Sequence, residues 1–378
     1  MITTINNKHN KLNVPNLRFK EFQGEWITYK IKDVLSIGNG RDYKHLSNGE
    51  IPVFGTGGYM TSVDECLYDG ETTFIGRKGS INKPFYYNGK FWTVDTLFYT
   101  HSFNGITPKF TYCLFQTINW LKYNEASGVP SLSKDTIEKI KINIPGLEEQ
   151  NKIAKLMFVL DERIATQNKI IEDLKELKSA IINYAINSLD TDFAKFNSLY
   201  EMAGEGGTPT TSNASFYDNG KIPFIKIDDL KQKYLIENND FITELGLQKS
   251  SAWLVPTSSI LFSNGATIGE ITITTYPVCT KQGILGIVPK QNIDVEYLYY
   301  FMSSSYFKKA VSRIVTEGTM KTAYLKDINN ILCPIPTKEE QHEIAKIPSA
   351  LNSKIDTEKS ILKLFITQKQ HLLHQMFI

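Results

Sequence analysis

The feature that most constrains the fold of this 378-residue chain is a motif that occurs twice. PGLEEQNKIA ends at Ala154, and IPTKEEQHEIA ends at Ala345, so the shared Glu-Glu-Gln and Ile-Ala recur 191 residues apart. A long sequence period of this kind indicates that one structural unit is present in two copies. We therefore expect the two halves of the chain to share one organisation.

Apolar residues follow each motif at alternating steps of four and three, which is the pattern of a coiled-coil seam. The first copy has Ile153, Met157, Leu160, Ile164, Gln167, Ile171, Leu174, Lys178, Ile181 and Ala185. The second copy has Ile344, Pro348, Leu351, Ile355, Glu358, Leu362, Phe365, Lys369, Leu372 and Met376. The polar breaks coincide as well, which favours a duplication over two unrelated amphipathic helices. Each copy predicts a rod of about 60 Å at about 1.5 Å per residue.

The motifs themselves have the chemistry of a helix start. Thr337 and Glu340 form a predicted capping box, and Gly146 and Glu149 occupy the same positions in the first copy. Glutamates in the first turn also favour the positive end of the helix dipole. A catalytic role for these carboxylates is therefore not needed. Pro348 lies inside the second seam, where we expect the helix to kink or restart.

The segments before the two helices share an order of short strand-like runs and glycine turns. GEIPVFGTGG at 49–58 corresponds to GKIPFIKIDD at 220–229, and FIGRKGSIN at 74–82 corresponds to LFSNGATIGE at 261–270. Such runs predict a mainly β body with few helices. The chain is thus predicted to have an α+β fold with two β-rich bodies, each followed by a long helix. The predicted divisions are a tail and lead-in at 1–25, a first body at 26–145, a central helix at 146–190, a second body at 197–336 and a C-terminal helix at 337–378.

The doubled motif, the two long helices and VPNLRFKEFQGEW near the N-terminus resemble the specificity subunit of type I restriction-modification systems. The resemblance covers nearly the whole chain. It implies two target recognition domains that each read half of a split DNA sequence, and helices that pack as an antiparallel coiled coil. These helices would set the spacer and dock two methyltransferase subunits. Pro348 and an N-terminal tail of about 14 residues depart from the family pattern.

The same resemblance implies that the chemistry lies in partner subunits. The methyltransferase subunits would bind S-adenosylmethionine and methylate adenine N6, and motor-nuclease subunits with ATP and magnesium would add cleavage. This chain has neither a cofactor-binding glycine loop leading into a helix nor an Asn-Pro-Pro-aromatic or Asp-Pro-Pro-aromatic turn. We therefore expect a non-catalytic chain without a cofactor of its own.

Other chemistry-bearing residues have simpler explanations. Asp228 and Asp229 beside Lys226 and Lys231 resemble the acids and lysine of a metal-dependent nuclease, but a surface turn that contacts bases or phosphates accounts for them better. His371 and His374 are three residues apart and are expected to be solvated or to face a partner. The six histidines show no zinc spacing, nor do the four cysteines, Cys66, Cys113, Cys279 and Cys333.

A net charge of only +2 is weak support for nucleic-acid binding, so basic residues would have to be concentrated on particular loops. Phosphate contacts supply affinity and base-edge contacts supply specificity. Polar residues on glycine-flanked loops are therefore the candidates. In the first body these are Arg41, Tyr43, Lys44, Arg77, Lys78, Ser80, Asn82 and Lys83. In the second body they are Lys226, Asp228, Asn264, Thr267, Lys281, Gln282 and Lys321.

GRKGSIN is the strongest of these stretches, since Arg77 could bind guanine or a phosphate with both guanidinium nitrogens. The neighbouring aromatics Tyr86, Tyr87, Phe91 and Trp92 are expected in the core and not against bases.

The predicted function is therefore that of a DNA sequence-recognition subunit that binds double-stranded DNA. The polar N-terminus does not resemble a signal peptide, and the apolar runs are too short to cross a bilayer, so we expect a cytoplasmic protein without membrane contact. Two alternatives are a coiled-coil scaffold that binds only proteins and a stand-alone nuclease or methyltransferase. The bases of the target do not follow from the sequence.

Overall fold

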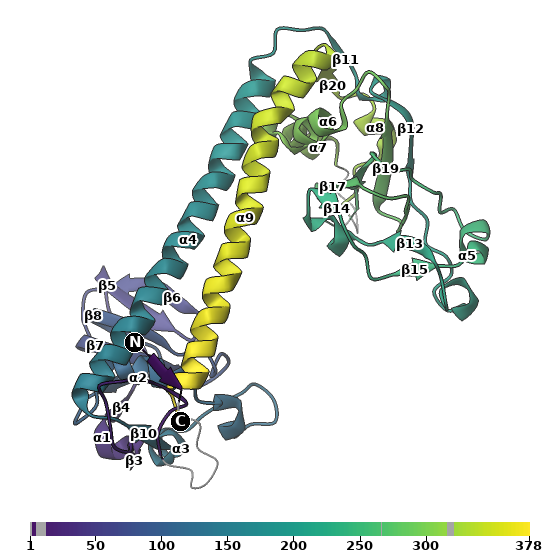
Figure 1. Cartoon of the computed structure of the whole chain (residues 1–378). Coiled ribbons are helices and arrows are strands. Elements are labelled where there is room, and N and C mark those ends of the chain that lie inside the picture. The colour runs from purple at the N-terminus through teal and green to yellow at the C-terminus, as the bar shows by residue number, and fades with distance from the viewer. Residues whose placement is uncertain (1, 5–12, 266, 316–320) are drawn as a thin grey trace. The chain divides into compact units, whose positions relative to one another are not determined.

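The computed structural model describes residues 2–4, 13–265, 267–315 and 321–378, and the chain forms two compact units (Figure 1). The first unit comprises Met1–Asn168 and Ser360–Ile378, and the second comprises Lys169–Lys359. Two long helices, α4 (Leu147–Asn187) and α9 (Lys338–Met376), contribute one end to each unit. Each unit therefore contains one β-rich body and two helix ends.

The first body is built on a six-stranded sheet with the order β4-β9-β7-β8-β5-β6. The pairing of β5 with β8 is parallel, whereas the other neighbours are antiparallel. The strands are β4 (Ser36–Asn39), β5 (Asn48–Gly55), β6 (Gly58–Val63), β7 (Tyr68–Gly76), β8 (Phe85–Thr93) and β9 (Leu97–His101). The remaining elements are β1 (Ile2–Thr4) paired with β2 (Leu17–Phe19), β3 (Ile27–Lys30) paired with β10 (Lys141–Ile144), and the helices α1 (Ile31–Val34), α2 (Pro108–Phe115) and α3 (Lys134–Lys139).

The second body has a five-stranded sheet with the order β12-β19-β16-β17-β14 and a three-stranded sheet with the order β15-β13-β18. The five strands are β12 (Tyr200–Glu205), β14 (Tyr234–Leu235), β16 (Ile260–Ser263), β17 (Ile271–Thr274) and β19 (Ile284–Pro289). The three are β13 (Ile222–Ile225), β15 (Phe241–Ile242) and β18 (Cys279–Thr280). The other elements are β11 (Phe193–Lys195) paired with β20 (Leu332–Pro334), and the helices α5 (Glu244–Gln248), α6 (Val295–Ser303), α7 (Ser305–Ile314) and α8 (Leu325–Ile328).

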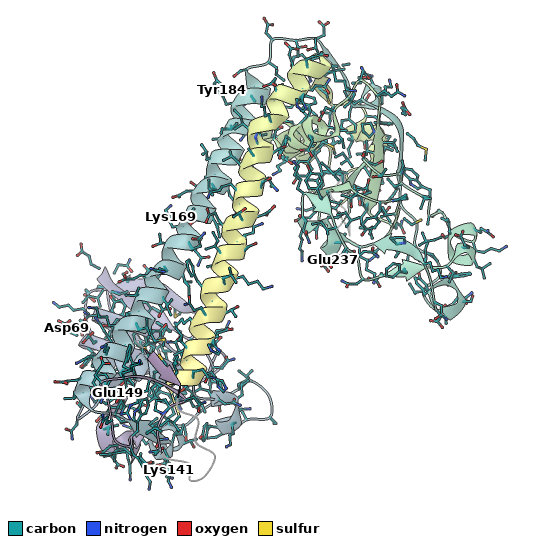
Figure 2. The ribbon with its side chains drawn as sticks, viewed as in Figure 1. Asp69, Lys141, Glu149, Lys169, Tyr184 and Glu237 are labelled. Atoms are coloured by element: carbon teal, nitrogen blue, oxygen red, sulfur yellow. The ribbon has the colours of Figure 1, made fainter. Side chains whose placement is uncertain are left out.

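The two long helices pair with opposite directions inside each unit. In the first unit, Ile153 and Met157 near the beginning of α4 share a core with Met376 near the end of α9. In the second unit, Ile186 near the end of α4 shares a core with Ala345 near the beginning of α9. Figure 2 labels Glu149 near one end of α4 and Tyr184 near the other. The predicted antiparallel pairing is confirmed, as is the predicted α+β fold.

The predicted seam is also confirmed residue by residue, since every position in both copies is buried or half-buried. This includes the polar positions, because Gln167, Glu358 and Lys369 are all buried. A seam that keeps a polar residue buried requires a partner for it, and Glu358 pairs with Lys354 while Lys369 pairs with Asp161.

Pro348 does not end or restart the second helix, since α9 runs without a break from Lys338 to Met376. Of the two expected outcomes, a kink or a restart, the restart is wrong, and the kink stays a prediction. A proline inside a helix removes one backbone hydrogen bond and costs about 3 kcal/mol. That cost is offset by packing on both sides of the proline, where Ala345 and Ile355 are buried in the second unit. Tertiary burial therefore holds the helix together through the defect.

Candidate nucleic-acid interface

The glutamine of the repeated motif joins each long helix by hydrogen bonds to the β-rich body that precedes it in the sequence. Gln150 Oε1 accepts a hydrogen bond from the Thr107 backbone N–H at 2.8 Å, and its Nε2 donates to the carbonyls of Gly105 and Pro145, both at 2.9 Å. The side chain is fully buried. It therefore joins the beginning of α4 to the segment that leads into α2.

Gln341 repeats this arrangement in the second unit. Its Oε1 accepts from the Asp294 N–H at 2.7 Å, and its Nε2 donates to Asn292 O at 3.2 Å and Pro336 O at 2.9 Å. We call the two arrangements the glutamine clamps. Sequence reasoning explained the motif as a helix start and missed this role; the signal was that the glutamine itself is kept in both copies.

The glutamates beside the clamps act differently in the two halves. Thr337 and Glu340 form the predicted capping box, with Thr337 N–H donating to Glu340 at 2.8 Å and Glu340 N–H to Thr337 Oγ1 at 3.3 Å. These bonds lower the pKa of Glu340. Glu149 has no hydroxyl partner at Gly146 and instead forms a buried two-bond pair with Arg18, both bonds 2.8 Å long. The N-terminal lead-in is thereby held on the first helix.

Beyond the clamps, the bodies share a set of backbone hydrogen bonds between loops. In the first body Arg77 N–H donates to Thr96 O at 2.8 Å, and Leu132 N–H donates to Arg77 O at 2.9 Å. In the second body, Asn264 N–H donates to Gly283 O at 3.0 Å and Ala323 N–H donates to Asn264 O at 2.9 Å. Arg77 and Asn264 therefore occupy equivalent positions.

A further pair of bonds brings another loop into the same arrangement. Val94 N–H donates to Phe54 O at 3.0 Å, and Lys281 N–H donates to Ile225 O at 2.9 Å. Lys281 of the second body is thus equivalent to Val94 of the first. By the same register, Gln282 is equivalent to Asp95.

Glycine is required directly after β4 in the first body and directly after β12 in the second, where each strand runs into the loops described above. A Cβ added to Gly40 would lie 1.9 Å from Val94 O, and one added to Gly206 would lie 2.2 Å from Thr280 O. The backbone therefore approaches more closely than any side chain would allow. We call the resulting sets of loops the first loop cluster (residues 38–41, 54–57, 76–83, 93–97 and 130–132) and the second loop cluster (204–208, 225–226, 263–265, 267, 280–284 and 321–323).

Several predicted DNA-contacting residues lie in or beside the first loop cluster. Arg41 is held by its backbone, which donates to Thr93 O at 2.7 Å and accepts from Trp92 Nε1 at 2.9 Å. The Arg77 guanidinium donates to Asp95 O at 3.3 Å and remains exposed. Tyr43 and Lys44 continue the loop after Arg41, while Lys78, Ser80, Asn82 and Lys83 continue the turn after Arg77. The structure therefore gathers these candidates at one end of the sheet.

The predicted DNA-contacting residues of the second body differ in their exposure and in whether they lie in the second loop cluster. Lys281, Gln282, Thr267 and Lys321 are exposed in the second loop cluster. Lys226 is also exposed there and pairs with Asp240 at 2.6 Å. Asp228 lies outside the cluster, on the short helix Ile227–Lys231, where it pairs with Lys231 at 2.8 Å.

Asn264 differs from the others because its side chain is buried, with only 1% exposed. Its Nδ2 donates to Ala323 O at 3.2 Å. In this position it fixes two loops against each other. A direct contact with DNA stays a prediction for it and for every other candidate.

Sequence reasoning did not name Asp95 as a candidate, although the shared register makes it equivalent to Gln282 of the second body. The signal was the threonine two residues before each of them, Thr93 and Thr280. Phe91 and Trp92 lie in the core as predicted, whereas Tyr86 and Tyr87 are half-buried. Tyr86 donates to the Glu71 carboxylate, and burial together with this bond raises its pKa.

The described residues contain no cluster of three histidine, cysteine or acidic side chains able to hold a metal ion. His9, one of the six histidines, lies outside the described residues. Cys113, Cys279 and Cys333 are buried and Cys66 is exposed; burial raises the pKa of Cys279 to about 11. In the part of the chain that the structure describes, every helix is too short or too polar to cross a bilayer.

Two long segments of the chain match one protein family. Residues 23–176 and 190–364 match the family model "Type I restriction modification DNA specificity domain". The type I restriction enzyme MjaIX specificity subunit of Methanocaldococcus jannaschii is 32% identical over 176 residues, which span 45% of this chain and 40% of that protein. A putative type I restriction enzyme specificity subunit of Haemophilus influenzae is 25% identical over 371 residues, 93% of this chain and 94% of that protein.

Solved structures show the same fold. The type I restriction-modification S subunit from M. genitalium aligns with a TM-score of 0.62 at 17% identity, covering 97% of this chain and 99% of that one. A chain from a type I system studied for complex assembly aligns with a TM-score of 0.58 at 14% identity, covering 93% and 97%. With two matched segments that together span most of its length, the chain belongs to the type I restriction modification DNA specificity family and carries two copies of its domain.

Proposed function

We propose that this chain is the DNA sequence-recognition subunit of a type I restriction-modification complex, and that each body reads one half of a bipartite, asymmetric target. One observation carries the proposal: the same loop cluster is built twice by matching backbone hydrogen bonds, but different side chains stand at the equivalent positions. A shared frame presents both clusters to DNA in one way. The differing side chains then select different bases.

The side chains at these positions suit base-edge and phosphate contacts. Arginine can bind guanine through two hydrogen bonds, glutamine can bind adenine in the same way, and lysine neutralises phosphate. Arg77 in the first cluster and Gln282 and Lys281 in the second therefore have the required chemistry. All three are exposed or carry exposed head groups in the described structure.

The paired helices would set the distance between the half-sites and dock two methyltransferase subunits. In that arrangement S-adenosylmethionine is bound by the methyltransferase subunits, while ATP and magnesium serve motor-nuclease subunits. The chain itself acts without catalysis, in the cytoplasm. A scaffold that binds only proteins would have no use for two equivalent loop clusters, so this alternative is not favoured.

The decisive experiment is co-expression with a cognate methyltransferase, followed by genome-wide mapping of N6-methyladenine. The wild-type chain is expected to give two half-sites separated by a fixed gap. Arg77→Ala should relax one half-site and Gln282→Ala only the other, by a discrimination of about 1–3 kcal/mol per contact. Lys122→Ala, an exposed change in the first body outside both the loop cluster and the long helices, is the matched control.

A scaffold would yield no sequence-dependent methylation at all, and relaxation of both half-sites by Arg77→Ala would refute the division of labour. Incubation of the purified chain alone with DNA, magnesium and S-adenosylmethionine tests for a stand-alone enzyme. We expect no reaction.

A further inference from the structure

Two lysines at equivalent seam positions lie in different surroundings. Lys369 on α9 is buried in the first unit, where it donates to Asp161 Oδ1 on α4 at 2.5 Å and to Gln116 Oε1 at 2.7 Å. A buried ammonium is stable only when charge and hydrogen-bond partners compensate for the lost water. The Asp161 carboxylate supplies that compensation.

Lys178 on α4 is the counterpart of Lys369, 191 residues earlier, but the side chain to which it donates is neutral. It donates to Asn352 Oδ1 at 2.9 Å, and Asn352 lies 191 residues after Asp161. The two glutamine clamps bind Thr107, just before α2, and Asp294, just before α6, so these two helices are equivalent. Gln116 follows Thr107 at the same sequence distance as Ser303 follows Asp294. Ser303 therefore stands at the position equivalent to Gln116. The second unit therefore has a carboxamide where the first has a carboxylate, and a short hydroxyl where the first has a long amide.

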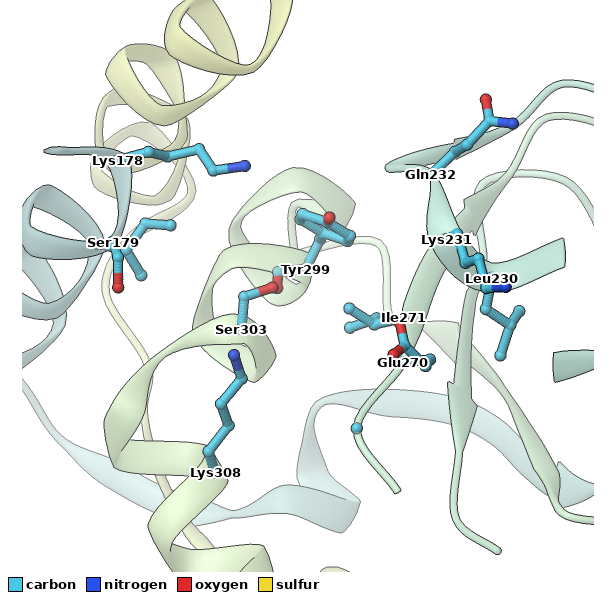
Figure 3. Close-up of a pocket in the computed structure, with 12 residues that line it drawn as sticks. Lys178, Ser179, Leu230, Lys231, Gln232, Glu270, Ile271, Tyr299, Ser303 and Lys308 are labelled. Atoms are coloured by element: carbon cyan, nitrogen blue, oxygen red, sulfur yellow. The ribbon is translucent and has the colours of Figure 1, made fainter. Parts of the chain in front are cut away.

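A cavity of about 270 Å³ lies beside Lys178 and Ser303. Its polar lining includes Lys178, Ser179, Lys231, Gln232, Ser303 and Lys308. Figure 3 shows Lys178 extending from α4, and Lys308 extending from α7 toward Ser303. The space is several times the volume of about 30 Å³ that one water occupies in the liquid.

The charges of the lining leave an excess of positive charge. Lys231 is paired with Asp228 at 2.8 Å, and Glu270 is the acidic residue of the lining. Lys178 and Lys308 together exceed Glu270 by one positive charge. Asp356 lies near Lys178 but is engaged by Asn352 Nδ2 at 3.0 Å. Burial lowers the pKa of Lys178, as expected for an ammonium whose compensation is incomplete.

We propose that this cavity binds a small phosphate-class oxyanion, which supplies to Lys178 the negative charge that Asp161 supplies to Lys369. Lysine ammonium groups bind phosphate as point charges. Lys308 contributes the second ammonium, and Ser179 and Gln232 also line the cavity. The anion would stabilise the junction between α4 and the second body, independently of target recognition.

The test is the thermal unfolding temperature of the full chain, titrated with inorganic phosphate against sodium chloride at matched ionic strength. The wild-type chain should show a saturable rise with phosphate. Lys308→Met should raise the apparent dissociation constant of phosphate at least about tenfold. Lys363→Met, on an exposed position of α9, should leave the titration unchanged.

Lys178→Met is the sharper variant because it removes the ammonium that the anion would compensate. It should abolish the response of the unfolding temperature to phosphate. A phosphate response that is absent in the wild-type chain, or equal in wild type, Lys308→Met and Lys178→Met, would overturn the proposal.

A duplex oligonucleotide distinguishes a free anion from a DNA phosphate. A free-anion site predicts the same duplex affinity in wild type and Lys308→Met, whereas a fall in duplex affinity without any phosphate response would assign the lysines to DNA. The phosphate titration contains no DNA. Its outcome is therefore separate from that of the proposed recognition function.

Discussion

Replacing Gln150 by alanine tests the glutamine clamp, the contact that most directly joins a recognition body to its helix. The change removes three hydrogen bonds, one each to the backbones of Thr107, Gly105 and Pro145. A hydrogen bond contributes about 0.5–1.5 kcal/mol net, and a buried group left without a partner costs about 1–3 kcal/mol. Pro145 is buried, whereas Gly105 is exposed and can bind water instead. The expected loss of unfolding free energy is therefore about 2–4 kcal/mol.

Urea unfolding gives the total loss, and hydrogen–deuterium exchange shows where it occurs. Gln150→Ala should speed exchange in peptides around Thr107 and leave those around Asp294 unchanged, while Gln341→Ala should do the reverse. Each variant thus controls for the other. Gln370→Ala, an exposed glutamine on α9, should cost less than about 0.5 kcal/mol.

The reasoning would be refuted if Gln150→Ala cost no more than Gln370→Ala. It would also be refuted if both clamp variants accelerated exchange equally in both units.

Three further predictions concern the cap, the loop clusters and the spacer. The hydrogen bonds with Thr337 lower the folded-state pKa of Glu340, so the stabilisation by the cap is fully present above the ordinary pKa of 4.5 and is lost as pH falls through the lowered value. Thr337→Val should weaken this acid dependence of α9 helicity, measured by circular dichroism. An unchanged pH profile would contradict the prediction. Gly40→Ala, whose Cβ would lie 1.9 Å from a carbonyl oxygen, should lower the unfolding temperature and broaden the first half-site, whereas Gly128→Ala, outside the cluster and with no atom within 4 Å of its Cβ, should do neither. A seven-residue insertion in α4 within 160–185, matched by one in α9, keeps the seam in phase. It should lengthen the gap between the two methylated half-sites without altering either half-site. Altered half-sites with an unchanged gap would show that the helices do not set the distance.

Much of the architecture follows from the sequence alone because it rests on local periodicity. The steps of four and three place one stripe of residues on one face of a helix whatever surrounds it. The seam from Ile153 to Ala185 and its repeat could therefore be predicted position by position. The Thr337–Glu340 cap is equally local, since both partners lie within one helical turn.

What the sequence could not determine are the contacts between segments far apart in the chain. The continuity of α9 through Pro348 depends on packing that local rules omit. The alignment of residues 74–82 with 261–270 already paired Arg77 with Asn264, but only the structure shows that Asn264 is buried while Arg77 is exposed. Lys178 and Lys369 make the point most clearly. Both are lysines at the same step of the same seam, but only the tertiary structure decides that one faces a carboxylate and the other a carboxamide beside a cavity, because that depends on which side chains the opposite helix brings within reach.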